Sequence, residues 1–436
     1  MAEIIAVENK MLGEKYYTFK HKTGLPVYVF PKKMTTSYAL FATKYGAIDN
    51  KFKLSSDDEF TSVPDGIAHF LEHKMFECED GSDAFELYAK TGASANAYTS
   101  NHMTAYLFSA TERFYESLEI LLDVVTHPYF TKETVEKEQG IIGEEIKMYD
   151  DHAGARLEKG LLEALYKYNK MRIDIAGTQE SISKIDADLL YRCYNVFYNL
   201  NNMALVVCGD VDVKKVEDVC DKMLKNAPRL EIVRDYEDEN EPKEVYKKRS
   251  ECYLAIAKPI FTIGIKDMDI PSDAKLRTKK ISAMHILNDM IFSQSGELYN
   301  TLYDSGLISH DLSYSFDMRK GSSYNQIYSE SQDPEKVYDI FVKHIKKLQK
   351  NGLDKEDFEL SKRTIYASFI KSFDSTEEIA NNMMYSIFDD ADILDTPEII
   401  TSVTYEYVSE LLNTMFKEEY YAMSVVKPIQ QEREEK

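Results

Sequence analysis

Apolar and polar positions follow a strand-like pattern near the start of the chain and then change to a helical period. Residues 23–33 (TGLPVYVFPKK) and 37–48 (SYALFATKYGAI) are rich in β-branched and aromatic residues and are separated by a Pro-Lys-Lys break. This pattern predicts two strands. Residues 55–66 are polar and end in Pro-Asp-Gly. They predict a loop that leads into a helix over the segment that follows.

The next segments alternate between the two types of periodicity. Residues 92–100 (GASANAYTS) and 104–110 (TAYLFSA) predict strands, and residues 203–212 (MALVVCGDVD) predict a buried strand that ends in a turn. Residues 112–123 and 132–149 have apolar positions at helical spacing. This mixture of strands and helices favours the α+β class.

Composition changes at residues 231–251, EIVRDYEDENEPKEVYKKRSE, which are charged and contain few aliphatic residues. We predict a linker there, between a first domain at 1–230 and a second at 252–436. The second half again predicts strands at 255–265, 311–318 and 324–331, and helices around Ile286 and Val342 and from Glu356 to Phe373. Two α+β halves of similar length indicate a degenerate duplication.

Net charge and hydropathy exclude several classes of partner. The 436 residues carry a formal net charge of −22, which disfavours nucleic acid and anionic membranes. No apolar run approaches the roughly 18 residues that span a bilayer. The first residues carry acids where a signal peptide is basic and then apolar, so we expect a cytoplasmic protein. The cysteines form no CxxC pair and predict reduced thiols: Cys78, Cys193, Cys208, Cys220 and Cys252.

Two histidines stand four residues apart in GIAHFLEHKMFE, residues 66–77. On a helix His69, Glu72 and His73 share one face. This spacing lets both imidazoles reach one ion at about 2.0–2.1 Å, while Glu72 addresses a metal-bound water. A catalytic zinc needs a third protein ligand and keeps a fourth position for water. The alternative is a helix that carries two histidines without a metal.

Residues 136–151, EKEQGIIGEEIKMYDD, offer the missing ligand. As a helix, this segment places one stripe of residues on its apolar side: Glu138, Ile142, Glu145, Ile146 and Tyr149. Glu144 is turned by about 100° from Glu145 and lies off the stripe. Because a buried carboxylate needs a partner, we predict Glu145 as the third ligand and Glu138 as a group that orients a histidine or Glu72. The alternative is internal salt bridges with Lys or Arg.

These segments resemble the insulinase/pitrilysin family of inverzincin metallopeptidases, whose HxxEH motif inverts HExxH. The similarity runs through most of the chain, in the same order and spacing, at PDGIAHFLEHKMFE, GASANAYTS, EKEQGIIGEEIKMYDD, AGTQESISKI and the strand ending in GDVD. The resemblance implies one Zn²⁺ per chain, held by His69, His73 and Glu145. It implies Glu72 as the general base and Glu138 as a supporting carboxylate.

The resemblance also implies an architecture and a partner. Two homologous α+β domains are expected, each a mostly antiparallel sheet flanked by helices, which together form half of a clamshell around a chamber. The partner would be an identical or a related subunit. The family uses an Arg and a Tyr to bind substrate, and Arg319 and Tyr324 lie in about the right region. Alternatively, the partner supplies that pair, and Arg319 is a solvated turn residue.

The implied reaction is the hydrolysis of peptide bonds by a zinc metalloendopeptidase. Zinc lowers the pKa of its bound water toward about 7, and Glu72 takes the proton of that water. The small residues of 92–100 suit pairing with an extended peptide, and the resemblance implies Asn96 and Ala97 as the contacts. The alternative for this segment is an ordinary strand packed under a helix. Expected substrates are unfolded peptides small enough to enter a closed chamber.

A non-catalytic, peptide-binding or scaffold subunit of a heteromeric peptidase is the competing function. In such relatives the zinc residues are characteristically lost, whereas all five positions are present in this chain. A serine or cysteine hydrolase finds no support, since the sequence contains no GxSxG.

Overall fold

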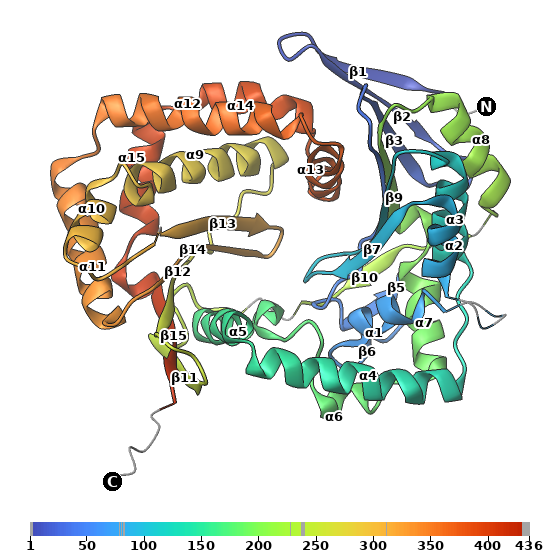
Figure 1. Ribbon diagram of the computed structural model, residues 1–436, viewed down its shortest axis with the longest axis horizontal. Helices are drawn as coiled ribbons and strands as arrows, with labels where there is room; N and C mark the ends of the chain where they lie inside the picture. The colour runs from blue at the N-terminus through green and yellow to red at the C-terminus, as the bar shows by residue number, and fades with distance from the viewer. Residues whose placement is uncertain are drawn as a thin grey trace. The chain divides into compact units, whose positions relative to one another are not determined.

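A computed structural model describes residues 3–77, 79, 81, 83–226, 228–236, 240–310 and 312–429 of the protein (Figure 1). Within these residues, no helix combines the length and the apolar character needed to cross a bilayer. Cys78 lies outside the described residues, and the other four cysteines are free thiols.

The chain forms two compact units that interleave along the sequence. Unit 1 comprises Met1–Ile146, Ile173–Tyr236 and Ile370–Asp395, and unit 2 comprises Lys147–Arg172, Glu237–Phe369 and Thr396–Lys436. Each unit has its own cluster of buried apolar side chains. The predicted division at 231–251 differs from this grouping, because 147–172 joins the second unit and 370–395 joins the first.

Unit 1 is built on a seven-stranded sheet with the strand order β1-β2-β3-β9-β4-β8-β7. The strands are β1 (Ile5–Asn9), β2 (Glu14–Lys20), β3 (Pro26–Pro31), β4 (Ser37–Thr43), β7 (Ser94–Thr99), β8 (Thr104–Ala110) and β9 (Met203–Gly209). Only β3 and β9 pair in parallel. A small second sheet contains β5 (Lys51–Leu54), β6 (Thr61–Ser62) and β10 (Ile232–Arg234).

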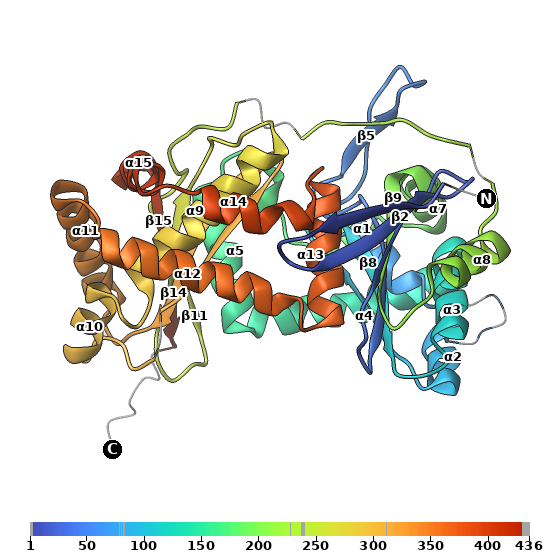
Figure 2. The ribbon, with the colours of Figure 1, turned by 90° about the horizontal axis from the view of Figure 1, so that it is seen from above.

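Unit 1 also contains helices, some of which contact its large sheet. They are α1 (Ile67–Lys74), α2 (Ala84–Thr91), α3 (Phe114–Thr126), α4 (Lys132–Asp151), α6 (Gln179–Ile182), α7 (Ala187–Phe197), α8 (Val213–Met223) and α13 (Thr376–Phe388). Helix α1 contacts β7 and β8, whereas α13, from the C-terminal part of the chain, packs on β4 and β9. Figure 2 shows the same ribbon seen from above.

Unit 2 has a five-stranded sheet with the order β11-β15-β12-β14-β13, in which only β11 and β15 are parallel. Its strands are β11 (Arg249–Leu254), β12 (Ile260–Lys266), β13 (Ser313–Arg319), β14 (Ser322–Glu330) and β15 (Tyr421–Pro428). Its helices are α5 (Ala153–Leu165), α9 (Ala274–Phe292), α10 (Glu297–Asp304), α11 (Pro334–Asn351), α12 (Lys355–Ser372), α14 (Thr396–Ser402) and α15 (Tyr405–Met415). Short 3₁₀ turns lie at Lys170–Arg172, Leu200–Asn202, Ile393–Asp395 and Glu418–Tyr420.

Close packing explains why residues 147–172 belong to unit 2. Helix α5 lies on β12, β15 and β11, and glycines stand at the points of nearest approach. A Cβ at Gly160 would lie 2.6 Å from Ser424 Oγ, and one at Gly264 would lie 2.6 Å from a methyl group of Leu161. The helical period of this segment shows that it has a buried face, but only the fold shows which sheet that face meets.

The predicted α+β class is confirmed, with mostly antiparallel sheets flanked by helices. The strands predicted in the first half correspond to β3, β4, β7, β8 and β9, and the three predicted helices correspond to α1, α3 and α4. Two predicted irregular segments contain strands instead. Residues 55–66 include β6, and the predicted linker 231–251 includes β10 and the start of β11. Short strands paired at one edge carry too little periodicity to be detected.

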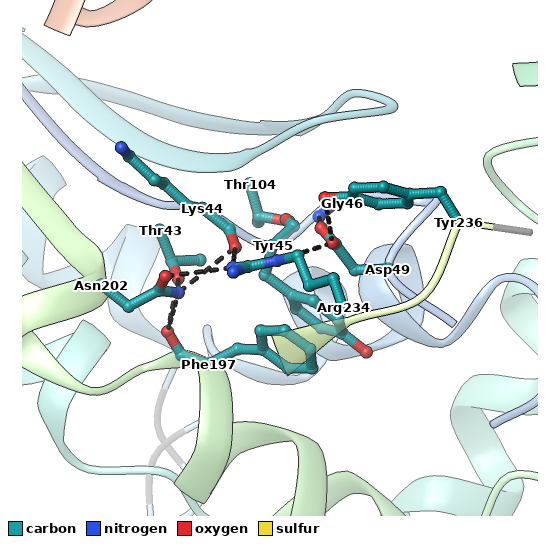
Figure 3. Close-up of polar contacts among 10 residues, drawn as sticks. All are labelled: Thr43, Lys44, Tyr45, Gly46, Asp49, Thr104, Phe197, Asn202, Arg234 and Tyr236. Carbon is teal, nitrogen blue, oxygen red and sulfur yellow. Dashed lines mark hydrogen bonds and ion pairs between the residues drawn. The ribbon is translucent and has the colours of Figure 1, made fainter. Parts of the chain in front are cut away.

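A buried ion pair fixes the chain where it leaves unit 1 after β10 (Figure 3). Arg234 Nε donates to Asp49 Oδ1 at 2.9 Å, and the Asp49 side chain is only 3% exposed. The other guanidinium nitrogen, Nη2, donates to Lys44 O at 2.6 Å and Asn202 Oδ1 at 3.0 Å. Asp49 Oδ2 accepts from the amide of Gly46 at 2.8 Å. These contacts tie β10 to the turn that follows β4.

We expect Arg234→Met to lower the free energy of unfolding by about 3–5 kcal/mol, because it leaves the Asp49 carboxylate buried without its partner. Burial raises the pKa of Asp49 and Arg234 opposes that rise, so the variant has a folded-state pKa further above the unfolded value. Its deficit relative to the wild type should therefore grow as pH rises above the unfolded value of about 4.

Urea unfolding of both proteins at several pH values measures this deficit. Lys184→Met serves as the control, because it removes an exposed ion pair with Glu180 and should leave the unfolding midpoint nearly unchanged. An equal effect of the two substitutions would contradict the assignment.

Candidate metal centre

Helix α1 begins at a glycine that no other residue could replace without strain. Gly66 has a φ of 89°, and a Cβ there would lie 2.4 Å from the carbonyl oxygen of Ala176. Gly177, the next residue of that loop, also has a positive φ, of 74°. The segments PDGIAHFLEH and AGTQESISKI are thus packed against each other, and this contact fixes the start of the helix that carries the histidines.

The structure brings His69, His73 and Glu145 together. The two imidazole rings of α1 have centroids 4.5 Å apart, at an interplanar angle of 63°. Glu145 Oε2, on α4, lies 3.4 Å from His73 Nε2 and 3.8 Å from His69 Nε2. One ligand atom from each of the three residues lies within 4.8 Å of the others. This separation suits a single ion bound between them.

Glu138 lies one step outside this cluster. Its Oε1 is 3.0 Å from His73 Nδ1, and its side chain is buried. A proton on Nδ1 donates to the carboxylate and leaves Nε2, the nitrogen nearer Glu145, with its lone pair free for a metal. The predicted role of Glu138, to orient a histidine, agrees with this geometry.

Unpaired polar atoms indicate that the three residues fit a cation. His69 Nδ1 and Glu145 Oε2 are buried and have no hydrogen-bond partner among the described residues. Burial, together with the charge of His73, lowers the pKa of His69 to about 3. The imidazole is therefore neutral, which is the form that binds metal. Two nitrogens and one carboxylate oxygen are one of the donor sets that hold catalytic zinc.

Glu72 stands beside the cluster and accepts a hydrogen bond from another element. Thr99 Oγ1, at the end of β7, donates to Glu72 Oε2 at 2.7 Å. Burial raises the pKa of Glu72, and the bond from Thr99 opposes that rise. A carboxylate with a raised pKa, placed next to a metal site, is suited to accept and return a proton.

The site opens on a cavity of about 990 Å³ that lies within unit 1. Its lining includes Glu72, His73 and Glu138, the β7 residues Asn96 and Ala97, and the side chains Phe76, Phe85, Tyr129, Lys132, Lys137 and Ile141. Strand β7 is the last strand in the order of its sheet. Its outer edge therefore borders the cavity with backbone groups that an extended peptide could pair with.

Arg319 and Tyr324 belong to unit 2 and do not line this cavity. Arg319 Nε lies 3.6 Å from Asp317 Oδ1. Tyr324 is buried within β14, and burial raises the pKa of its hydroxyl group. Their role in substrate binding remains a prediction.

The predicted inward-facing stripe of α4 agrees with the structure at Glu145 but not at Tyr149. Glu145 faces inward and Glu144 is exposed, as the helical projection indicated. Tyr149, expected on the same buried stripe, is 43% exposed. The reason is that unit 1 ends at Ile146, so the last turn of the helix has no core of that unit to pack against.

Sequence reasoning also missed Thr99. In a strand, alternate residues face the same side, so Thr99 shares the face of Ala97. The sequence therefore predicts that Thr99 and Ala97 face the same side, but nothing in it indicates that this face of β7 lies against α1 at Glu72.

Comparisons with known proteins cover most of the chain. Residues 61–179 match the family model described as Insulinase (Peptidase family M16), and residues 184–365 match the model described as Peptidase M16 inactive domain. A Bacillus subtilis protein named uncharacterized zinc protease YmfH is 39% identical over 412 residues, which are 93% of this chain and 95% of that protein. The chloroplastic stromal processing peptidase of Arabidopsis thaliana is 32% identical over 203 residues, 44% of this chain and 15% of that protein.

Solved structures show the same fold. One described as an M16-like peptidase, from Alicyclobacillus acidocaldarius, has a TM-score of 0.91 at 30% identity and covers 98% of this chain and 100% of its own. A protease from Helicobacter pylori has a TM-score of 0.81 at 19% identity, with 95% of this chain and 100% of that chain covered. The second similarity concerns the fold alone.

We expect the protein to bind one zinc ion and Glu145→Gln or His73→Ala to weaken that binding more than Glu138→Gln does. Loss of a residue that orients a ligand weakens metal affinity by about 10- to 100-fold, and loss of a ligand removes a bond to the metal itself. Competition with a chromogenic chelator measures the affinity.

Glu144→Gln is the matched control for this metal experiment. It changes the neighbouring carboxylate on the exposed face of α4 and should bind zinc as the wild type does. Equal affinities of the variants at 144 and 145 would show that Glu145 is not a ligand.

Proposed function

Because the chain belongs to the insulinase family of peptidases, M16, we propose that it is a zinc metalloendopeptidase that cleaves unfolded peptides, with Glu72 as the general base. The observation that carries this proposal is the cluster of His69, His73 and Glu145, from which His73 and the neighbouring Glu72 line a cavity. Relatives named zinc proteases support the choice of metal.

The residues of the chain divide the chemistry between them. Bound at the cluster, zinc would polarise the scissile carbonyl and lower the pKa of a water molecule. Glu72 takes the proton of the attacking water and passes it to the leaving amine. Glu138 holds the His73 ring through Nδ1, so the ring keeps its orientation through the cycle.

Strand β7 is the proposed binding site of the peptide substrate. Asn96 and Ala97 line the same cavity as Glu72 and His73, and a peptide added to the edge of the sheet would run past these groups in an extended conformation. Main-chain hydrogen bonds give affinity without regard to side chains. A folded protein cannot supply an extended segment without local unfolding, so unfolded peptides are the proposed substrates.

A non-catalytic, peptide-binding role is the second candidate. It is favoured by the match of residues 184–365 to a model described as an inactive domain. That region excludes the histidine motif, whereas the match to the insulinase model includes His69, Glu72, His73 and Glu145. The retained site therefore favours the catalytic proposal.

We expect Glu72→Gln to keep its zinc but to reduce peptide cleavage by about 10²- to 10⁴-fold, because the amide cannot accept the proton of the water. Cleavage of a mixture of quenched fluorogenic peptides, with metal content measured in parallel, tests this. Glu136→Gln, an exposed position on α4, is the control and should cleave normally. Wild-type zinc protein that cuts none of these peptides would support the non-catalytic role instead.

We further propose that the protein acts in the cytoplasm with a second subunit, either an identical copy or a related chain. The second subunit is proposed from the family resemblance. Native mass spectrometry of the protein, alone and co-expressed with any related chain, should give a species heavier than the 50.3 kDa of one chain. A single-chain mass in both samples would contradict the proposal.

A further inference from the structure

Thr99 contacts Glu72, the proposed general base, but has no role in the mechanism proposed above. Its hydroxyl group lies 2.7 Å from Glu72 Oε2, and because an ionised carboxylate only accepts hydrogen bonds, Thr99 is the donor. Glu72 is 9% exposed. A hydrogen bond to a charged, buried carboxylate is among the stronger ones in a protein and has directional geometry.

Strand β7 is held on both faces, so the Thr99 hydroxyl group has little freedom to move. Thr99 faces α1, and the neighbouring Tyr98 faces the opposite side, where its hydroxyl group lies 3.2 Å from Asn381 Oδ1 on α13. In the register of the hairpin, Thr99 pairs with Thr104 of β8, whose own hydroxyl group donates to Tyr45 O at 2.9 Å.

The end of the β7–β8 hairpin is anchored to the turn that follows β4. The amides of Ala47 and Ile48 donate to the carbonyl oxygens of Ser100 and Asn101 at 3.0 and 3.2 Å. A Cβ at Gly46 would lie 2.3 Å from Asn101 O, so only glycine permits this approach. The turn is itself fixed by the buried Asp49 shown in Figure 3. Thr99 therefore lies next to a hairpin end that hydrogen bonds anchor to a buried turn.

We propose that Thr99 is a positioning residue, whose hydroxyl group holds the Glu72 carboxylate in one orientation and leaves its second oxygen for the attacking water. This inference rests on the proposed peptidase function. Peptide binding and orientation of the base would then depend on the same strand. Asn96 and Ala97 would bind the peptide, and Thr99, at the end of the strand, would orient Glu72. A peptide that pairs with β7 would thus meet a carboxylate held in position by the same strand.

The test compares Thr99→Val, which keeps the shape but removes the hydroxyl group, with Thr99→Ser, which restores it. We expect Thr99→Val to lower kcat by about 10- to 100-fold, with KM and zinc content within about twofold of wild type. Thr99→Ser should recover most of kcat. Thr43→Val is the matched control, because it removes a buried hydroxyl group that donates to Phe197 O in the same sheet without touching Glu72.

Crystal structures of the metal-free wild type and both Thr99 variants provide a readout that does not depend on activity. The Glu72 carboxylate should keep one orientation in the wild type and in Thr99→Ser, and should rotate or become disordered in Thr99→Val. If the zinc-loaded wild type cleaves no peptide, the proposed function fails, while these structures still decide whether Thr99 holds Glu72.

Three results would overturn the inference. In the first, the Thr99→Val carboxylate is unmoved and kcat falls less than threefold. In the second, Thr99→Ser is as impaired as Thr99→Val. In the third, Thr43→Val shows the same kcat loss, since the effect would then follow from any lost hydroxyl group in the sheet.

Discussion

The site depends on one electrostatic constraint, which is the position of the Glu145 carboxylate, with one oxygen atom buried, next to the imidazoles of His69 and His73. A carboxylate oxygen without a hydrogen-bond partner is costly in a protein interior, and Glu145 Oε2 has none among the described residues. A cation shared with the nearby nitrogens of His69 and His73 would compensate it. The fold around it serves this arrangement, because α1 is fixed at Gly66 and Glu138 fixes the His73 ring.

Strand β7 connects the proposed metal site with the proposed peptide-binding edge. It is the edge of its sheet, it lines the cavity with Asn96 and Ala97, and it ends in the threonine that contacts Glu72. Binding groups and the proposed base thus share one rigid element, and sites built on strands hold their geometry more closely than sites built on loops. The buried Asp49 and Arg234 pair extends this rigidity to the point where the chain leaves unit 1.

The chain passes between the two units more than once, so each unit contains segments that are far apart in the sequence. Residues 370–395, far from the metal site in sequence, return to unit 1 and place α13 on β4 and β9. Through Asn381 and Tyr98 this late segment contacts the strand that borders the cavity. A late segment of the chain therefore supports the strand that borders the proposed peptidase site. Conversely, α5, which directly follows α4, belongs to unit 2.

The sequence by itself determined the α+β class, the two histidines with Glu72, and the choice of Glu145 over Glu144. All of these follow from periodicity within one helix or strand, which is a local property. Tertiary structure alone decided the exchange of segments between the units, the exposure of Tyr149 and the contact of Thr99 with Glu72. These depend on which element packs against which. An apolar face in the sequence predicts that the element is buried there, but it does not predict which other element covers it.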